Sequence, residues 1–205
     1  MKKRGFLVTI ASPSGGGKST ICKEILKINP LFCYSTSWTT RARRGDEING
    51  KDYFFTDTTT FQKKIKEGFF LEYAEVHNNF YGTSKDYIEQ CLNEEKIVLL
   101  DIDVQGVELI KKQGFDIVTI FILPPNEEIL KQRLISRNTD SMEVINKRLQ
   151  NAKKELDYMK DYDFLVINDD ICQAVEVVNN ILVAETNRFK RYIDPVKEYY
   201  LKDEN

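Results

Sequence analysis

The feature that most constrains the fold is a glycine-rich loop, SPSGGGKST, placed between a short apolar run and an amphipathic segment. The apolar run covers residues 6–11, and the loop follows it directly. Apolar residues then recur at helical spacing: Ile21, Ile25, Leu26 and Ile28. Asn29-Pro30 ends the pattern. The order strand, glycine loop, helix predicts the first unit of an α/β fold with a parallel sheet.

The loop contains the residue types that bind phosphate. Glycines allow several backbone N–H groups to approach one anion, and the start of a helix adds positive potential. Lys18 can reach phosphate oxygens, and the Ser19 hydroxyl is placed to hold Mg²⁺. Ser12 stands where the usual pattern has glycine, so the backbone there must suit a serine. The alternative is a glycine turn that caps the helix without a ligand.

Strands and helices alternate along the rest of the chain. Apolar runs predict strands at 97–103, 116–123 and 164–168, and amphipathic patterns predict helices that begin at Ser84 and cover about 104–113, 126–137, 141–158 and 171–185. This alternation predicts a parallel sheet covered on both faces.

The segment 33–83 interrupts this alternation and reads as an inserted antiparallel module. It contains a short strand at 53–55, a helix from Asp57 to Gly68 and a strand at 69–76. At the other end of the chain, the tail from Arg188 is either a terminal helix or a flexible extension.

Composition excludes several classes of partner and site. The formal net charge is -2, which argues against nucleic acid and anionic membranes as partners. No two of the four cysteines lie within ten positions, so no CxxC-type metal or redox motif is present. No segment has the roughly 20 apolar residues that cross a bilayer, and we expect a cytoplasmic protein.

A basic cluster lies in the inserted segment. Arg41, Arg43 and Arg44 are surrounded by serine and threonine hydroxyls between residues 35 and 40, and Tyr53 follows. Arginine with hydroxyls and a tyrosine is suited to a phosphate monoester. The alternative is a solvated basic loop.

Glu72 and Thr83 are candidates for base recognition. A carboxylate matches the N1–H and N2–H₂ donors of guanine, and a hydroxyl can donate to O6. Adenine lacks that donor pair and would leave a buried Glu72 unpaired. The alternative is that Glu72 points outward from an alternating strand.

Asp101 and Asp103 follow a buried apolar run, where phosphate-loop proteins carry a metal-side carboxylate. We expect the strand to end between them, so that the two carboxylates serve different ligands. The alternative is that both only cap the next helix.

Several motifs together resemble the guanylate kinase family. They are SPSGGGKST, SWTTRARRGDEINGKDYFF, FLEYAEV, FYGTS and LLDIDVQG, in the family's order and with similar spacing. The similarity continues through LPPNEEILKQRLISR, INKRL and VINDD, to about residue 185. It implies a three-layer P-loop NTPase fold of the α/β class with a central parallel sheet, an inserted GMP-binding module and a helical lid. The implied boundaries are 1–32, 84–125 and 158–205 for the ATP-binding core, 33–83 for the GMP module and 126–157 for the lid.

The resemblance also implies a reaction, the transfer of the γ-phosphate of ATP to GMP, and to dGMP, with Mg²⁺ as cofactor. It places the protein in guanine nucleotide biosynthesis and GMP recycling, as a monomer or homodimer. Two alternatives stay open: a protein-interaction module without catalysis, and a kinase for another nucleoside monophosphate or a phosphorylated sugar.

The resemblance assigns residues to each ligand. For ATP they are Ser12, Pro13, Ser14, Gly15, Gly16, Gly17, Lys18, Ser19, Thr20, Arg133, Asn168 and Asp169, the last two near the adenine. For GMP they are Ser37, Arg41, Arg44, Tyr53, Glu72, Tyr81, Thr83 and Asp103. Catalysis is assigned to Lys18, Arg41, Arg44, Arg137 and Arg148, and the metal to Ser19 and Asp101.

Overall fold

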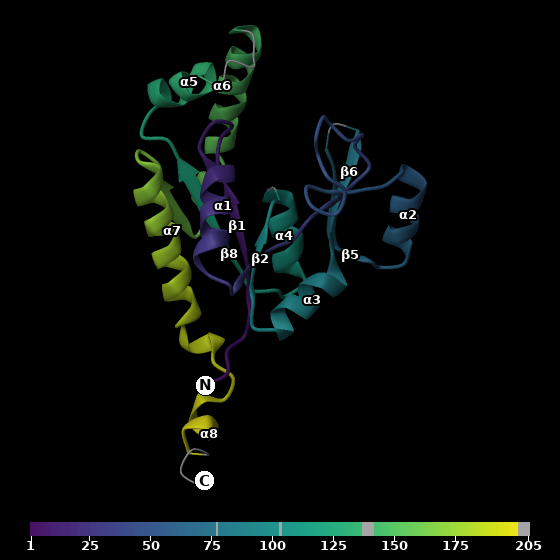
Figure 1. The fold of residues 1–205 in the computed structure, drawn as a ribbon, viewed down its shortest axis with the longest axis vertical. Coiled ribbons are helices and arrows are strands. Elements are labelled where there is room, and N and C mark those ends of the chain that lie inside the picture. Colours follow the sequence, from purple (N-terminus) through teal and green to yellow (C-terminus); the bar gives the residue numbers. More distant parts are fainter. Residues whose placement is uncertain (77, 103, 137–141, 201–205) are drawn as a thin grey trace. The chain divides into compact units, whose positions relative to one another are not determined.

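The computed structural model describes residues 1–76, 78–102, 104–136 and 142–200 (Figure 1). The chain divides into two compact units. Unit 1 comprises Met1–Arg4, Ile10–Pro30 and Val118–Asn205, and unit 2 comprises Gly5–Thr9 and Leu31–Ile117. The division passes through the first strand, so the predicted boundaries of core, module and lid remain predictions.

The larger sheet has five strands in the order β2-β7-β1-β8-β9. Their bounds are β1 Phe6–Ala11, β2 Phe32–Tyr34, β7 Ile97–Leu100, β8 Ile117–Leu123 and β9 Phe164–Ile167. β7 runs parallel to both β1 and β2, and β8 runs parallel to β9. Residues Phe6, Leu7, Val8 and Ile10 are all buried, so both faces of β1 are covered. The predicted α/β fold with a central parallel sheet is confirmed.

Unit 1 contains the helix that follows the glycine loop and the helices that follow β8 and β9. They are α1 Lys18–Ile28, α5 Glu127–Ser136, α6 Met142–Leu156, α7 Ile171–Thr186 and the short α8 Pro195–Tyr200. Figure 1 shows α5 and α6 side by side, joined by a small apolar cluster of Leu130, Leu134, Ile145 and Ala152. α1 packs against α7. The described part of the tail therefore contains a short helix, one of the two forms expected for it.

Unit 2 contains α2 Thr58–Lys66, α3 Lys85–Asn93 and α4 Val104–Lys112. Its core joins strand residues Leu7, Val98 and Leu100 to apolar side chains of α3 and α4. They are Ile88, Cys91, Val107 and Ile110. Each unit thus has buried apolar contacts of its own.

Unit 2 also contains a smaller sheet of four strands in the order β4-β3-β6-β5. The strands are β3 Trp38–Thr39, β4 Phe54–Phe55, β5 Phe70–Val76 and β6 Asn79–Ser84. β6 pairs antiparallel with β5 and β3, as expected for the inserted segment, whereas β4 pairs parallel to β3.

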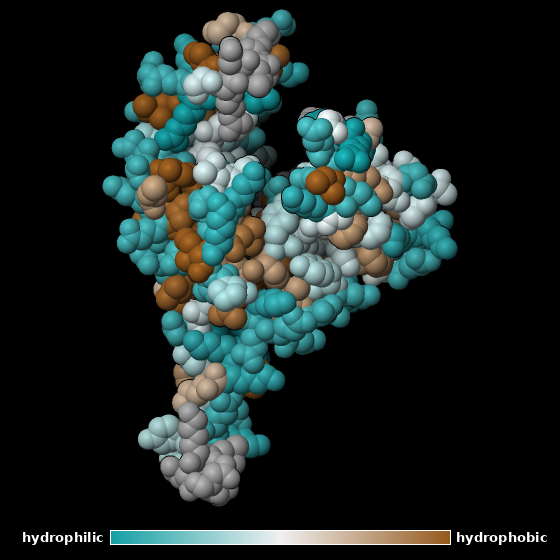
Figure 2. Space-filling model, in the orientation of Figure 1, coloured by the Kyte–Doolittle hydropathy of each residue, from teal (hydrophilic) through white to brown (hydrophobic). Residues whose placement is uncertain are grey.

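The two faces of the smaller sheet differ in character. One face packs on α2, where the Phe61 ring stacks on Phe70 at 4.3 Å between centroids. Gly82 lies under these rings, since an added Cβ would sit 2.8 Å from Phe70 Cδ1. The outer surface of α2 carries hydrophilic and intermediate side chains (Figure 2). The other face presents Tyr81 and Thr83, because side chains two apart on a strand share a face.

Candidate active site

The glycine loop in unit 1 connects β1 to α1 through two glycines with positive φ. Gly15 has φ 93° and Gly17 has φ 101°, values that L-residues rarely adopt. Gly17 is the N-cap of α1 and its carbonyl accepts from the Thr20 and Ile21 N–H groups at 3.1 Å. The loop therefore leads into the helix N-terminus, where the backbone favours an anion.

Ser12 fits the start of the loop. It is not among the described non-glycine residues with positive φ, and its hydroxyl donates to the Pro13 carbonyl at 3.1 Å. The expectation that the backbone here suits a serine is confirmed. An added Cβ on Gly16 would lie 2.8 Å from Ser12 Cβ, so Gly16 makes room for this serine.

Polar side chains of α1 and α6 lie at the loop. Lys18, Ser19 and Thr20 form the first turn of α1, and the latter two are exposed. Arg148 of α6 donates through Nη1 to Ser14 Oγ at 3.5 Å. The structure thus brings the predicted Arg148 to the predicted loop.

Glu155, a residue not expected from the sequence, also belongs to this half of the site. Partial burial raises the pKa of the Glu155 carboxyl, and the Lys18 ammonium and the Ser14 N–H lower it in part. A carboxylate of α6 therefore interacts with the same two residues that the resemblance assigns to phosphate.

The remaining residues assigned to ATP lie after β9 and on α5. Arg133 donates to the backbone carbonyl of Asp169 at 3.0 Å. Asn168 is buried and donates through Nδ2 to the Gly16 carbonyl at 2.7 Å. Arg137 lies outside the described residues.

In unit 2, the Arg41 guanidinium is held in a closed set of contacts. Its Nη2 donates to Glu47 Oε1 at 2.6 Å, and its Nη1 donates to the Ala42 carbonyl at 2.8 Å. It lies over the Tyr53 ring at 5.2 Å from the centroid and is only 10% exposed. The other Glu47 oxygen accepts from the Arg44 N–H at 2.8 Å.

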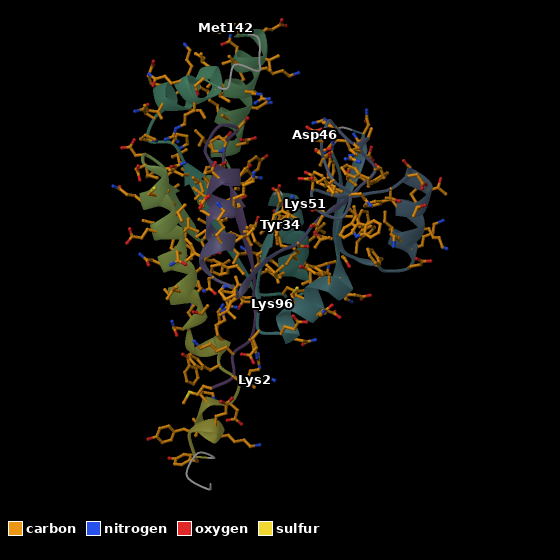
Figure 3. The ribbon with its side chains drawn as sticks, in the orientation of Figure 1. Lys2, Tyr34, Asp46, Lys51, Lys96 and Met142 are labelled. Carbon is orange, nitrogen blue, oxygen red and sulfur yellow. The ribbon has the colours of Figure 1, made fainter. Side chains whose placement is uncertain are left out.

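These contacts define the charges of the loop. Hydrogen bonds from Arg41 and from the Arg44 N–H lower the pKa of the Glu47 carboxyl, and the bond to Glu47 raises the pKa of Arg41. Figure 3 labels two neighbours in this loop, Asp46 and Lys51. The Arg44 side chain is exposed. The loop therefore holds one guanidinium fixed against Glu47 and leaves the other exposed.

Two aromatic rings continue from this arginine into the smaller sheet. The Tyr53 and Tyr81 rings meet edge to face at 6.1 Å. Tyr81 and Thr83 share a face of β6. Ser37, which precedes β3, is buried. Of the residues assigned to GMP, the structure thus brings Arg41, Tyr53 and Tyr81 into one cluster.

Glu72 and Thr83 lie opposite each other on β5 and β6 and are both buried. The Thr83 hydroxyl donates to Glu72 Oε1 at 2.5 Å. An added Cβ on Gly106 would lie 3.2 Å from the other carboxylate oxygen. The alternative of an outward-facing Glu72 is wrong: the carboxylate is held inward, and a buried carboxylate is costly unless it has donors.

The two aspartates after β7 are only partly described. β7 ends at Leu100, so the strand predicted for 97–103 ends before both residues and not between them. Asp101 is exposed, and Asp103 lies outside the described residues. The pairing of β7 with β1 ends at Leu100, opposite Thr9, although β1 itself continues to Ala11.

Comparison with known proteins decides the family. The family model described as guanylate kinase matches residues 4–185. A guanylate kinase of Rickettsia typhi is 46% identical over 90% of this chain and 93% of its own length. One of Clostridioides difficile is 40% identical over 98% of both chains. The chain belongs to the guanylate kinase family.

A solved structure agrees with this membership. The crystal structure of guanylate kinase from Anaplasma phagocytophilum matches with a TM-score of 0.78 and 32% identity, over 96% of this chain and 94% of that one. As a member of the guanylate kinase family, the chain is a nucleotide-binding kinase, and the family's reaction is the ATP-dependent phosphorylation of GMP to GDP.

The described residues contain neither a membrane-spanning helix nor a cluster of metal-binding side chains. Within the described ranges, no helix combines the length and the apolar character needed to cross a membrane. Among the same residues, no three His, Cys, Asp or Glu side chains form a metal-binding group.

Proposed function

We propose that this chain transfers the γ-phosphate of ATP to GMP, with ATP at the glycine loop of unit 1 and GMP at the smaller sheet of unit 2. The observation that carries the choice of acceptor is the buried Glu72 carboxylate held by Thr83. Such a carboxylate needs donors, and guanine supplies two on one edge. The same sheet region carries Arg41 and Tyr53, suited to a phosphate monoester.

On the donor side, the loop and the α1 N-terminus bind the phosphates of ATP. Lys18 neutralises charge on the β- and γ-phosphates, and Arg148 approaches the loop from α6 through its contact with Ser14. Arg137 would act from the same side of the reaction. An arginine that contacts the transferring phosphate can increase kcat of such a reaction by a factor of about 10³–10⁵.

Mg²⁺ fits the donor side. The exposed Ser19 hydroxyl lies in the first turn of α1. The preceding loop bends at Gly15 and Gly17, whose positive φ values let its backbone N–H groups face an anion. Hard oxygen ligands of this kind suit Mg²⁺, which binds through few protein groups and the phosphates of its nucleotide. Ser19 and Asp101 would hold the ion. When bound, it would neutralise charge on the β- and γ-phosphates.

No general base is required. The second pKa of a phosphate monoester is about 6, so GMP is already largely dianionic at neutral pH and its oxygen can attack. The protein then contributes alignment and charge neutralisation. Arg41 and Arg44 hold the attacking phosphate, and Lys18 and Arg148 hold the leaving and transferring ones. Closure of 126–157 as a lid would exclude water, which otherwise hydrolyses ATP.

We also propose which nucleotides are accepted and where the protein acts. dGMP is accepted as well as GMP, because the guanine edge and the phosphate carry the recognition. The protein acts in the cytoplasm, as a monomer or homodimer, and without nucleic acid. The even charge balance supports the last point.

The test is an ADP-release assay with ATP and Mg²⁺, comparing GMP, dGMP, AMP, CMP, UMP and no acceptor. We expect turnover with GMP and dGMP only, and none with EDTA. Equal turnover with AMP would refute the proposed role of Glu72. Absence of turnover with every acceptor, in folded protein, would refute the reaction and favour an interaction module.

A variant tests the loop. Replacing Lys18 with alanine (Lys18→Ala) should lower kcat by about 100-fold or more, as the loss of one pre-organised donor to a reacting oxyanion does. Lys23→Ala is the matched control, because Lys23 lies exposed on the same helix. A kcat within a few-fold of the parent would contradict the role of Lys18.

A further inference from the structure

Asn168 has an environment that its assignment to adenine does not explain. It directly follows β9, and its own N–H donates to the Leu123 carbonyl of β8 at 2.8 Å. The residue is 2% exposed. Its carboxamide Nδ2 donates to the Gly16 carbonyl at 2.7 Å, and this hydrogen bond is buried. The end of the sheet is therefore tied to the middle of the glycine loop.

The next loop residue leaves space for this carboxamide. Gly17 has φ 101°, and a Cβ added there would overlap Asn168 Nδ2. Glycine is therefore required at position 17 for two reasons: its positive φ, and the space that the Asn168 carboxamide occupies. The three parts, Gly16 carbonyl, Gly17 and Asn168, thus fit one another.

The hydrogen bond fixes the direction of a peptide group. A peptide unit is planar and trans, so the Gly16 carbonyl and the Gly17 N–H point in opposite directions. Between two glycines, little else restricts rotation of that unit. Once the carbonyl is held by Asn168, the Gly17 N–H must point away from Asn168. The Gly17 carbonyl is held as well, by the first turn of α1.

We propose that Asn168 is a positioning residue for the phosphate loop: it holds the Gly16–Gly17 peptide so that the Gly17 N–H is already directed at the phosphates of ATP. This rests on the proposed function of the loop in binding ATP. Pre-organised donors cost no reorganisation when the anion arrives. Asn168 then acts on the triphosphate through the backbone, and not through the adenine.

Inorganic tripolyphosphate separates these two roles because it has phosphates and no base. We would measure its binding, and that of ATP and GMP, by titration calorimetry. The proteins are the parent, Asn168→Ala, Asn168→Leu and the control Asn180→Ala, an exposed asparagine of α7. Both Asn168 variants should bind tripolyphosphate and ATP about tenfold more weakly and by the same factor, the scale for losing a buried hydrogen bond. GMP affinity should not change.

A purely structural role would not give that pattern. Partial unfolding lowers the fraction of competent protein and would affect GMP equally, so thermal unfolding and binding stoichiometry are recorded for each variant. Asn168→Leu keeps the side-chain volume if Asn168→Ala is unstable. Unchanged tripolyphosphate affinity would overturn the inference, whether or not ATP binding weakens. Because this binding needs no turnover, a parent inactive toward GMP would refute the proposed reaction and leave the comparison intact.

A double-mutant cycle tests the contact with Gly17. Gly17→Ala should weaken tripolyphosphate binding strongly in the parent and less in the Asn168→Ala background, where the carboxamide no longer occupies the space. Losses that simply multiply would contradict the steric part of the inference.

Discussion

At the scale of single residues, the acceptor half-site depends on a carboxylate that the basic motif does not reveal. Glu47 accepts from both the Arg41 guanidinium and the Arg44 backbone N–H. Free arginine side chains lose conformational entropy when they bind a phosphate, by about 0.5–1.5 kcal/mol each. Because Glu47 already holds Arg41 in place, part of this conformational entropy is already lost in the free protein.

We therefore expect Glu47→Ala to raise the KM for GMP by about three- to tenfold, with little change in the KM for ATP. Steady-state kinetics with each substrate varied in turn would measure this. Asp46→Ala is the control, since Asp46 is an exposed neighbour in the same loop (Figure 3). A lower KM for GMP would mean that Glu47 competes with the phosphate instead of positioning Arg41.

Base recognition gives a second prediction at this scale. The variant Glu72→Gln keeps the size of the side chain but replaces one acceptor oxygen by a donor, so it no longer matches the two donors of guanine. We expect kcat/KM for GMP to fall by about 100-fold, the loss of hydrogen bonds to a charged group. Glu75→Gln, on the exposed part of the same strand, should be close to the parent.

IMP, which lacks the 2-amino group, provides the critical comparison for Glu72. If the carboxylate reads that group, the parent prefers GMP to IMP and the variant loses most of this preference. An unchanged ratio of kcat/KM for the two nucleotides would show that Glu72 does not contact the 2-amino group.

At the scale of elements, α2 supports the face of the smaller sheet opposite Tyr81 and Thr83, and its start depends on one cap. Asp57 Oδ1 accepts from the Thr60 N–H at 2.8 Å, and Oδ2 accepts from the Thr60 hydroxyl at 2.7 Å. These hydrogen bonds lower the pKa of the Asp57 carboxyl in the folded protein. Its contribution to stability is therefore present above the pKa of the unfolded chain and is lost as the pH falls through the lower, folded value.

Asp57→Ala should lower the free energy of unfolding at neutral pH, because the Thr60 N–H loses its capping acceptor. Urea unfolding at a series of pH values would measure it, and the difference from the parent should shrink below about pH 4. Asp57→Ser, which restores a capping oxygen without the charge, should recover most of the stability at neutral pH. A serine variant as unstable as the alanine variant would contradict capping as the cause.

The sequence predicted elements well where one segment carries its own signal. The β1–α1 unit and the cap at Asp57 depend on local patterns, and the structure confirms them. β6 was not predicted, because NFYGTS lacks alternation and becomes a strand by pairing with β5 and β3. β2 and β3 are too short to show a period.

The same distinction holds for side chains of the site. The glycine loop could be predicted because its glycines, Lys18 and Ser19 are adjacent in the sequence. The partner of Gly16, Asn168, could not, since a hydrogen bond between residues 152 positions apart leaves no local pattern. Glu47 lies only six residues from Arg41, but nothing in the loop sequence shows that the two side chains meet. The residue types were visible, but their hydrogen-bond partners are a result of the tertiary fold.

At the scale of the whole molecule, the N-terminal residues and the segment that follows α7 are hydrogen-bonded to each other within unit 1. The Arg4 N–H donates to the Arg191 carbonyl at 2.6 Å, and the Ile193 N–H donates to the Lys2 carbonyl at 3.0 Å. The Lys2 backbone N–H also donates to both carboxylate oxygens of Glu198 in α8, at 2.9 Å each. The segment after α7 is thereby docked to the residues that lead into β1.

A buried ion pair anchors this junction. Arg191 Nη2 lies 3.3 Å from Glu185 Oε2, with side chains only 2% and 6% exposed. Arg188 lies 3.1 Å from the same carboxylate but is 57% exposed. Removing one partner of a buried pair costs about 3–5 kcal/mol, because the other charge stays buried, whereas exposed pairs contribute about 0–1 kcal/mol.

Arg191→Leu should therefore lower the free energy of unfolding by about 3 kcal/mol or more, and Arg188→Leu by less than about 1 kcal/mol. Denaturant unfolding of both variants would measure this. Adding Glu185→Leu to Arg191→Leu removes the remaining buried charge, so the double variant should be more stable than Arg191→Leu alone. A double variant that is less stable than the single one would show that packing of the arginine stem, and not the charge left on Glu185, is what the junction loses.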